Sequence, residues 1–417
     1  MIFRTLAFLA VFVTASNTRA ETIDEKVLSW RDEVKGNHLV INGSIVTDMV
    51  IFPRVETGYG KSWHVGPSLR EVRIGSDFQL SKVWGGRLDI ELSSLDPIRM
   101  DMWAEYRALD FLRIRVGRFK IPFGLIQQLG VCEQPLLETP MVIGNPKDFR
   151  DTGLMLLGEI WGKRVTYGVA VVTGSRDRAV DVNEKPDIVG SLRVYPFREL
   201  GSWFENLGFG TSVSWGLGPL RKGFRGRTMA NWTFVNPPSI RGEQLRWGAD
   251  FEWAMDRVNV RAEYMWQRQV RDSLEDLQLV NGTMMEVGDL EPWVVHGFYT
   301  DLKVHVWGKR QGLKPITGVE IVSRFESMHF GDGSHLETIP EGEVDRAPLP
   351  DSQIQGVSVG VHGYLGWGVR LTVLYQGLRF GVRALSPDYD SSAIPDQDPE
   401  EKGHWVNHFF ARAQWVY

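Results

Sequence analysis

The sequence contains little cysteine and, after its first residues, no long apolar run. Cys132 is the single cysteine, which excludes an intramolecular disulfide. Beyond residue 20, no apolar run approaches the roughly 20 residues that a membrane-spanning helix requires. The formal net charge of −5 argues against a nucleic-acid-binding protein, because such proteins are typically basic. Two classes remain: a protein that is soluble in an extracytoplasmic space, and a protein that crosses a membrane as a closed barrel.

The first twenty residues have the pattern of a secretory signal peptide. Arg4 precedes a short apolar run, and small or polar residues then lead to Ala20. The apolar run is too short for a membrane anchor. We therefore expect a cleaved signal peptide at 1–20, an N-terminal periplasmic segment with a short helix at 21–37, and the main folded unit at 38–417.

The stretch from Leu112 to Phe123 has the alternation of a strand whose two faces meet different media. Apolar residues alternate with Arg113 and Arg115 as far as Val116. Beyond Gly117 the apolar and charged residues change places, so we expect a bulge or kink at this glycine to restore the register. An unpaired charge is costly to bury. A strand with lipid on one side and a water-filled lumen on the other avoids that cost, so the pattern predicts a transmembrane strand.

Similar two-sided segments recur along the chain, which also contains 44 glycines and 16 tryptophans. This composition suits many strands, tight turns and the aromatic belts of a membrane barrel. Sixteen candidate strands can be marked: 39–52, 68–80, 85–94, 101–109, 112–123, 151–162, 165–175, 187–197, 206–217, 245–255, 257–269, 292–307, 313–328, 354–364, 368–379 and 404–417.

The connections between these strands alternate in length. Those after even-numbered strands are mostly short, whereas long ones follow odd-numbered strands at 124–150, 218–244, 270–291, 329–353 and 380–403. Short periplasmic turns that alternate with long outer loops are typical of bacterial outer-membrane barrels. The sequence therefore predicts an all-β fold, a transmembrane antiparallel β-barrel of about 16 strands.

One motif resembles a known family. Gly117 to Gly124 reads Gly-Arg-Phe-Lys-Ile-Pro-Phe-Gly, which resembles the Gly-Gln-Phe-Lys-Val-Pro-Phe-Gly signature of the phosphate-selective porin O and P family. Further segments are similar to that family at Leu69 to Gly75, Arg150 to Gly153, Gly248 to Tyr264 and Val359 to Tyr375. The resemblance covers most of the mature chain. It implies a trimeric porin whose third outer loop folds into the lumen and narrows it.

A pore of this kind selects solutes by its electric field and its width. Loop 124–150 is the candidate constriction, with the charged residues Glu133, Glu138, Lys147 and Arg150. The candidate anion-binding residues of the wall are Arg113, Arg115, Arg118 and Lys120, with Arg73, Arg87 and Arg107 on earlier strands. Cations that line a channel raise the local concentration of anions. Acidic residues share the inner face, so a second role stays open, in which cross-strand ion pairs stiffen the wall.

Enzyme-like patterns in the chain have simpler explanations. Gly356 to Gly360 matches Gly-x-Ser-x-Gly around Ser358, but it lies among alternating valines with no helical pattern after it. His404 and His408 share one face of a strand and lack an HExxH motif. Cys132 has no candidate catalytic partner. We expect no enzymatic activity, no cofactor and no metal.

The sequence thus predicts a porin of the bacterial outer membrane. It would allow passive diffusion of small hydrophilic solutes with a preference for anions, phosphate-type anions among them. Its expected partners are these solutes, outer-membrane lipid, lipopolysaccharide and two further copies of the chain, but no nucleic acid. The alternative is a structural, receptor or envelope-complex subunit whose lumen is blocked by loop 124–150 or by residues 21–37.

Overall fold

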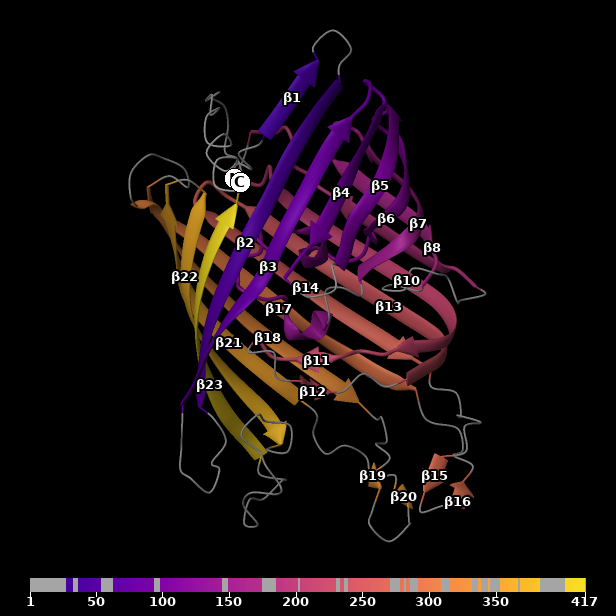
Figure 1. Ribbon diagram of the computed structural model, residues 1–417, viewed down its shortest axis with the longest axis vertical. Helices are drawn as coiled ribbons and strands as arrows, with labels where there is room; N and C mark the ends of the chain where they lie inside the picture. The colour runs from indigo at the N-terminus through magenta and orange to yellow at the C-terminus, as the bar shows by residue number, and fades with distance from the viewer. Residues whose placement is uncertain are drawn as a thin grey trace, which may run out of the picture.

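The chain forms one large β-sheet that closes on itself (Figure 1). The computed structural model describes residues 28–32, 37–53, 63–93, 98–144, 149–174, 185–201, 203–229, 233–235, 239–270, 278–280, 283–285, 292–308, 316–331, 337–338, 344–345, 353–366, 368–382 and 402–416. The predicted signal peptide at 1–20 lies outside the described residues. So do residues 21–27 and 33–36 of the predicted N-terminal segment.

Sixteen antiparallel strands make up the barrel, each paired with the next along the chain, and the pairing of β2 with β23 closes it. They are β2 (Asn37–Pro53), β3 (Trp63–Gln79), β4 (Trp84–Glu91), β5 (Ile98–Leu109), β6 (Leu112–Lys120), β7 (Arg150–Ile160), β8 (Val165–Val172), β9 (Asp187–Val194), β10 (Leu207–Lys222), β13 (Ser239–Ala254), β14 (Val258–Gln269), β17 (Trp293–Gly308), β18 (Ile316–Gly331), β21 (Gln353–Leu365), β22 (Val369–Val382) and β23 (Lys402–Val416). The predicted barrel of about 16 strands is confirmed.

Connection lengths differ between the two ends of the barrel. At one end, the short-turn end, two to four residues join several neighbouring strands, as at 110–111, 161–164 and 255–257. At the other end, the loop end, the connections include 121–149 and 270–292. The predicted alternation is confirmed: antiparallel strands place successive connections at opposite ends of the barrel, and the long ones lie at the loop end. No helix in the described part of the chain is long and apolar enough to cross a membrane.

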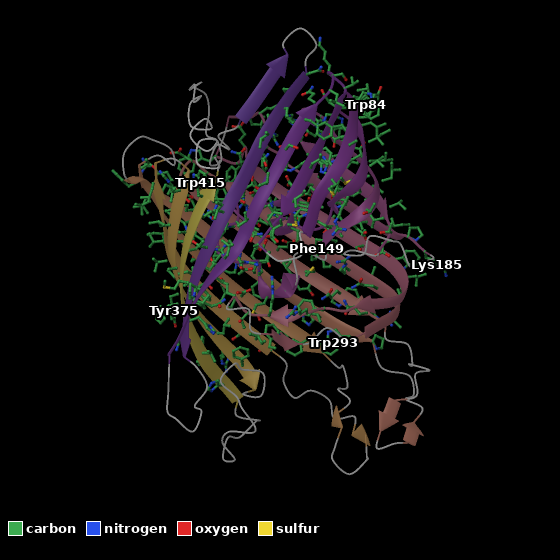
Figure 2. The ribbon with its side chains drawn as sticks, viewed as in Figure 1. Trp84, Phe149, Lys185, Trp293, Tyr375 and Trp415 are labelled. Atoms are coloured by element: carbon green, nitrogen blue, oxygen red, sulfur yellow. The ribbon has the colours of Figure 1, made fainter. Side chains whose placement is uncertain are left out.

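The outer surface of the barrel is apolar, as a wall in contact with lipid requires. On β21, Val357, Val359 and Val361 point outward, whereas Ser358, which lies between two of them, and His362, which follows them, are fully buried inside. This alternation follows directly from the period of two in a strand. Figure 2 shows the same division: Trp84, Tyr375 and Trp415 lie on the outside, and Trp293 lies inside.

The N-terminal segment contains a strand where we expected a short helix. Strand β1 (Leu28–Asp32) pairs antiparallel with residues 37–41 of β2. Strand β23 pairs with β2 only from Ser44 onward, so the first residues of β2 have a free edge on that side. A free edge offers unpaired backbone groups. Pairing with β1 satisfies them, which explains why the segment is extended.

The barrel interior at the loop end is unexpectedly apolar. Phe119, Ile121 and Phe123 are buried there in one cluster with wall residues of the later strands. The predicted bulge at Gly117 is wrong, because β6 keeps a continuous register with both β5 and β7 through this residue. Gly117 has a φ of +125°, and a Cβ there would lie 2.3 Å from the Met102 carbonyl oxygen. The glycine thus allows a close strand contact, and the three apolar residues stay on the inner face.

Candidate functional site

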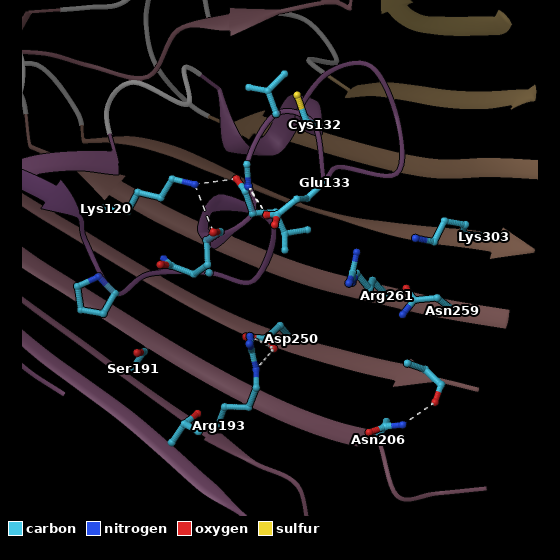
Figure 3. Close-up of a pocket in the computed structure, with 18 of the residues that line it drawn as sticks. Lys120, Cys132, Glu133, Ser191, Arg193, Asn206, Asp250, Asn259, Arg261 and Lys303 are labelled. Carbon is cyan, nitrogen blue, oxygen red and sulfur yellow. Dashed lines mark hydrogen bonds and ion pairs between the residues drawn. The ribbon is translucent and has the colours of Figure 1, made fainter. Parts of the chain in front are cut away.

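A cavity of about 1380 Å³ occupies the interior near the short-turn end (Figure 3). Its rim includes the turn at 254–259, and its inner limit is formed by Lys120, Pro122, Gly124 and residues 128–133. We call this cavity the vestibule. The predicted constriction loop therefore crosses the lumen between the vestibule and the loop end.

The vestibule carries more basic than acidic side chains. Nine Arg and Lys residues line it against six Asp and Glu residues, although the whole chain has a net charge of −5. The basic residues are Arg73, Arg87, Arg115, Lys120, Arg193, Arg257, Arg261, Lys303 and Arg370, and the acidic ones are Glu71, Asp101, Glu133, Asp250, Asp256 and Glu320. An excess of cations in an enclosed, watery space favours anions.

Five of the predicted wall arginines form ion pairs along the wall. Arg115 lies 2.6 Å from Glu105 and also stacks over the Trp103 ring, with its Cζ 3.9 Å from the ring centroid. The other four pairs are Arg113 with Glu159 at 3.0 Å, Arg87 with Asp89 at 2.8 Å, Arg73 with Glu71 at 3.2 Å and Arg107 with Glu105 at 2.9 Å. Wall pairing, one of the two roles left open, is thus present. The excess of nine basic over six acidic residues counts only the side chains that line the vestibule, and Glu105 and Asp89, the partners of Arg115 and Arg87, are not among them.

Arg118 takes a position that the expected bulge would not have given it, whereas Lys120 lies inside the barrel as predicted. Alternation places Arg118 on the face of Val116, which is 55% exposed on the outside of the barrel. Lys120 lines the vestibule, where its Nζ donates to the carbonyl oxygens of Gln128 (3.2 Å) and Leu129 (2.8 Å). Of the four cations predicted as one cluster, Arg113, Arg115 and Lys120 therefore lie inside the barrel and Arg118 lies outside, with Lys120 turned inward at the last residue of β6.

The constriction loop begins with a buried anchor on the opposite wall. The Glu263 carboxylate on β14 accepts hydrogen bonds from the amides of Leu125 (3.2 Å) and Ile126 (3.3 Å) and from the Tyr299 hydroxyl (2.9 Å). The Gly124 amide donates to Ser212 Oγ at 3.1 Å. Because Gly124 has a φ of +69° and a Cβ there would lie 2.3 Å from Glu263, this turn requires glycine.

The middle of the loop is held by several strands on the far wall. His362 Nε2 lies 2.8 Å from the Pro135 carbonyl oxygen, Arg324 Nη1 donates to the Glu138 carbonyl oxygen at 2.8 Å, and the Met141 amide donates to Glu326 at 2.7 Å. Short 3₁₀ turns, η2 (Ile126–Gln128) and η3 (Met141–Ile143), shape the loop. The inward fold implied by the family resemblance is present.

The four charged residues predicted for the constriction have different surroundings. Glu138 pairs with Arg70, Arg150 pairs with Asp101 at 3.2 Å, and Glu133 accepts a hydrogen bond from the Gly130 amide at 2.7 Å while it lines the vestibule. Lys147 lies outside the described residues. Glu138 and Arg150 are thus held in ion pairs, and of the three described residues Glu133 lines the vestibule.

Arg70 is a residue that sequence reasoning missed. Alternation with Glu71 and Arg73 would turn it outward, but a register shift between β2 and β3 places Val46 opposite Glu71 and Thr47 opposite Leu69. Arg70 is the extra residue of this bulge, and its Nε and Nη2 donate to Glu138 at 2.7 Å each. A bulge re-aims a side chain without any mark in the apolar pattern.

A second connection also folds inward at the loop end. Residues 218–244 were expected to be a solvated outer loop, but β10 extends to Lys222 and β13 begins at Ser239. Phe224, Thr228 and Met229 are buried between them. The Phe224 amide donates to Gln269 at 3.1 Å, and strands β11 (Gly226–Arg227) and β12 (Thr233–Val235) follow. This segment packs on the constriction loop and adds to the apolar cluster.

Two loop residues have shifted pKa values with clear causes. Burial alone would raise the pKa of the Glu138 carboxyl, but attraction by Arg70 and Arg412 outweighs burial and holds the pKa below its usual value. Burial and the nearby Glu71 carboxylate raise the pKa of the Cys132 thiol to about 11. The first group is thus a carboxylate at neutral pH, and the second is a thiol with little nucleophilic thiolate.

The enzyme-like patterns lie within the barrel wall. Ser358 is fully buried in the middle of β21, with no helix after it. His408 lies on β23 and is buried inside the barrel. In the part of the chain that the structure describes, no three His, Cys, Asp or Glu side chains are grouped to hold a metal ion.

No protein-family model matches the chain, and no curated protein matches it. Similarity is found among solved structures. OmpT of Vibrio cholerae in its trimer form matches with a TM-score of 0.53 and 12% identity over 91% of this chain and 99% of that one. The anion-selective porin from Comamonas acidovorans has a TM-score of 0.53 and 11% identity over 91% and 100% of the two chains. Salmonella typhi OmpF, in complex with daunomycin, has a TM-score of 0.54 and 10% identity over 93% and 100%.

Identities this low show a shared fold and nothing finer. The likeness to the phosphate-selective porin O and P family therefore stays a prediction. The fold itself has an apolar outer wall, an even number of strands and long connections at one end only. The chain is a sixteen-stranded β-barrel of the type that bacterial outer-membrane porins have, and its place is the bacterial outer membrane.

Proposed function

We propose that this protein is a porin that lets small hydrophilic solutes diffuse passively across the outer membrane, with a preference for anions. The observation that carries the proposal is the vestibule, with its excess of basic side chains beneath an inward loop. A solute that enters from the loop end would meet this field after it passes the constriction loop. Cations at that point raise the local concentration of anions without binding them so tightly that passage stops.

The finer parts of the proposal concern single residues, solutes and partners. The candidate selectivity residues are those that line the vestibule: Arg73, Arg87, Arg115 and Lys120. Arg107 and Arg113 instead form ion pairs with Glu105 and Glu159 along the wall. Phosphate-type anions follow only from the family resemblance. A homotrimer agrees with the trimer form of the similar OmpT, and an anion preference agrees with the similar Comamonas porin. Lipopolysaccharide is proposed as a partner of the outer rim, and no enzymatic activity is proposed.

Reversal potentials in planar lipid bilayers test the proposal. The purified protein is inserted between chambers of unequal potassium chloride concentration, and phosphate is then added as a competitor. We expect a small conductance. The reversal potential should be displaced toward the equilibrium potential of chloride. A cation-selective current would contradict the anion preference, and a lower chloride current with added phosphate would support phosphate as a solute.

A second function is favoured by one observation, the apolar packing at the loop end. One buried cluster joins the constriction loop, the segment after β10 and the wall at the loop end. It includes Phe119, Phe224 and Trp293. A lumen filled in this way would suit a structural, receptor or envelope-complex subunit. Membranes that stay silent after verified insertion would support this alternative over the channel.

A further inference from the structure

Three arginine side chains converge on the carboxylate of Glu138 in the constriction loop. Arg70 on β3 donates from Nε and Nη2 to the two carboxylate oxygens at 2.7 Å each. Arg412 Nη2 on β23 lies 3.4 Å from Oε1, and Arg227 Nη2 on β11 lies 3.9 Å from Oε2. We call Arg70, Arg227 and Arg412 the arginine cage.

The cage is a built site and not a chance surface contact. The Arg412 side chain is 1% exposed and is fixed by Asp48, which accepts from Nε at 2.6 Å and from Nη2 at 2.7 Å. Arg70 points inward because of the bulge in β3, and its side chain remains 31% exposed. The cage is therefore rigid on one side and open to solvent on another. A planar fork that grips two oxygens at once fits a carboxylate.

The Glu138 carboxylate is not needed to keep the loop in place. The loop backbone is held beside it by Arg324 at the Glu138 carbonyl oxygen, by His362 at Pro135 and by Glu326 at the Met141 amide. These bonds come from two other strands, β18 and β21. The Glu138 side chain can leave the cage while the loop backbone stays where it is.

We propose that the arginine cage binds the carboxylate group of a small organic anion, and that Glu138 occupies the cage as an internal ligand when no such anion is present. Binding by the cage stands on these contacts alone, whereas its use in permeation rests on the proposed channel. A tethered carboxylate has a high effective concentration. It keeps the affinity for the external anion low, so the anion can leave again.

Removal of the internal ligand tests the proposal. Succinate, acetate and inorganic phosphate are titrated by calorimetry at constant ionic strength into the detergent-solubilised full-length protein. Glu138→Gln should bind succinate about tenfold more tightly than the unaltered protein, because the cage is then available almost all the time. Glu243→Gln is the control for the same change of charge, because Glu243 accepts from Trp215 Nε1, pairs with Arg268 and, among the described contacts, has none with the cage arginines or the vestibule. It should leave the affinity unchanged.

A double variant links the gain to the cage. In Glu138→Gln with Arg70→Gln, the tighter succinate binding should disappear. No gain in Glu138→Gln, or a gain that persists without Arg70, would overturn the proposal. Tighter binding of phosphate than of succinate would overturn the carboxylate assignment. If Glu138→Gln fails to fold, Glu138→Asp, which withdraws the carboxylate by one methylene, should show a smaller gain, and an absent gain counts against the cage.

Conductance then separates this proposal from the proposed channel. Succinate should reduce the chloride current through Glu138→Gln at lower concentration than through the unaltered protein. Silent membranes together with intact succinate binding would contradict the channel and leave the cage in place. A normal chloride current without succinate binding would contradict the cage and leave the channel in place.

Discussion

The two halves of the barrel interior are built on the same strands but contain different media. Near the short-turn end the inner face carries cross-strand ion pairs such as Arg115 with Glu105 around a cavity. Near the loop end the inner face carries Trp293 and Phe330, whose stacked rings lie 6.3 Å apart beneath packed loop residues. Strand β6 contributes Arg115 to one half and Phe119 to the other, from the same face. Alternation therefore tells which face a side chain occupies, but not what that face meets.

The largest expected effect separates the packed interior from the lipid-facing wall. Phe119→Ala should lower the free energy of unfolding by about 3–5 kcal/mol, because it leaves a cavity in a fully buried cluster. Val116→Ala, on the outer face of the same strand, should cost much less. Urea unfolding in detergent, followed by gel mobility of the folded barrel, measures both. Equal losses would show that the loop half is loosely filled.

The next effect concerns the anchor of the constriction loop. Glu263→Ala leaves the amides of Leu125 and Ile126 and the Tyr299 hydroxyl without their acceptor, and should cost about 1–3 kcal/mol. The loop should also loosen, so the single-channel conductance should rise. Glu252→Ala is the control. Glu252 on β13 pairs with Arg261 on β14, the strand that also carries Glu263, and this pair lies away from the loop. An unchanged conductance would mean that this anchor does not set the width of the pore at the constriction loop.

The pH dependence of stability should report on the Glu138 carboxylate. Its pKa is held below the usual 4.5, so it stabilises the folded protein above that pH, and the contribution is lost as the pH falls through the lowered value. The difference in melting temperature between the unaltered protein and Glu138→Gln should therefore be largest at neutral pH and shrink in acid. A difference that stays constant with pH would argue that Glu138 acts by shape alone.

The smallest effect compares two arginines on opposite faces of β6. Arg115→Gln removes one of the nine cations of the vestibule and should shift the reversal potential away from chloride. Arg118→Gln, on the outer face, should leave it nearly unchanged. Reversal potentials in a salt gradient decide between them. A larger shift for Arg118→Gln would mean that Arg118, and not Arg115, faces the lumen.

The sequence predicts the barrel well because strand alternation and loop lengths are local properties. The sixteen strands and the long connections at one end follow from them, as does the general expectation of cross-strand ion pairs on the inner face. Other features depend on contacts between distant segments. Whether Phe119 meets water, lipid or a loop is decided by what folds over it, and Phe224 is buried only because its own connection also turns inward.

Two further features leave no trace in the apolar pattern. The bulge that turns Arg70 inward adds one residue to β3 while both flanking stretches keep their alternation. Strand β1 forms because β2 extends beyond β23, which cannot be known before the register of the barrel is fixed. The inward fold of loop 124–150 was therefore predicted, but its contacts with the wall, such as that of Arg70 with Glu138, were not.

The contrast between the two halves can be tested directly by the access of water-soluble reagents. Single cysteines are introduced at Asn259, which lines the vestibule, and at Ile354, which is buried in the loop half, after Cys132→Ser removes the native thiol. Each variant in lipid vesicles is treated with small anionic and cationic thiosulfonates. The cysteine at 259 should react rapidly, and faster with the anionic reagent, while the cysteine at 354 should react slowly with both. Equal rates at the two positions would contradict a watery vestibule beneath a packed loop half.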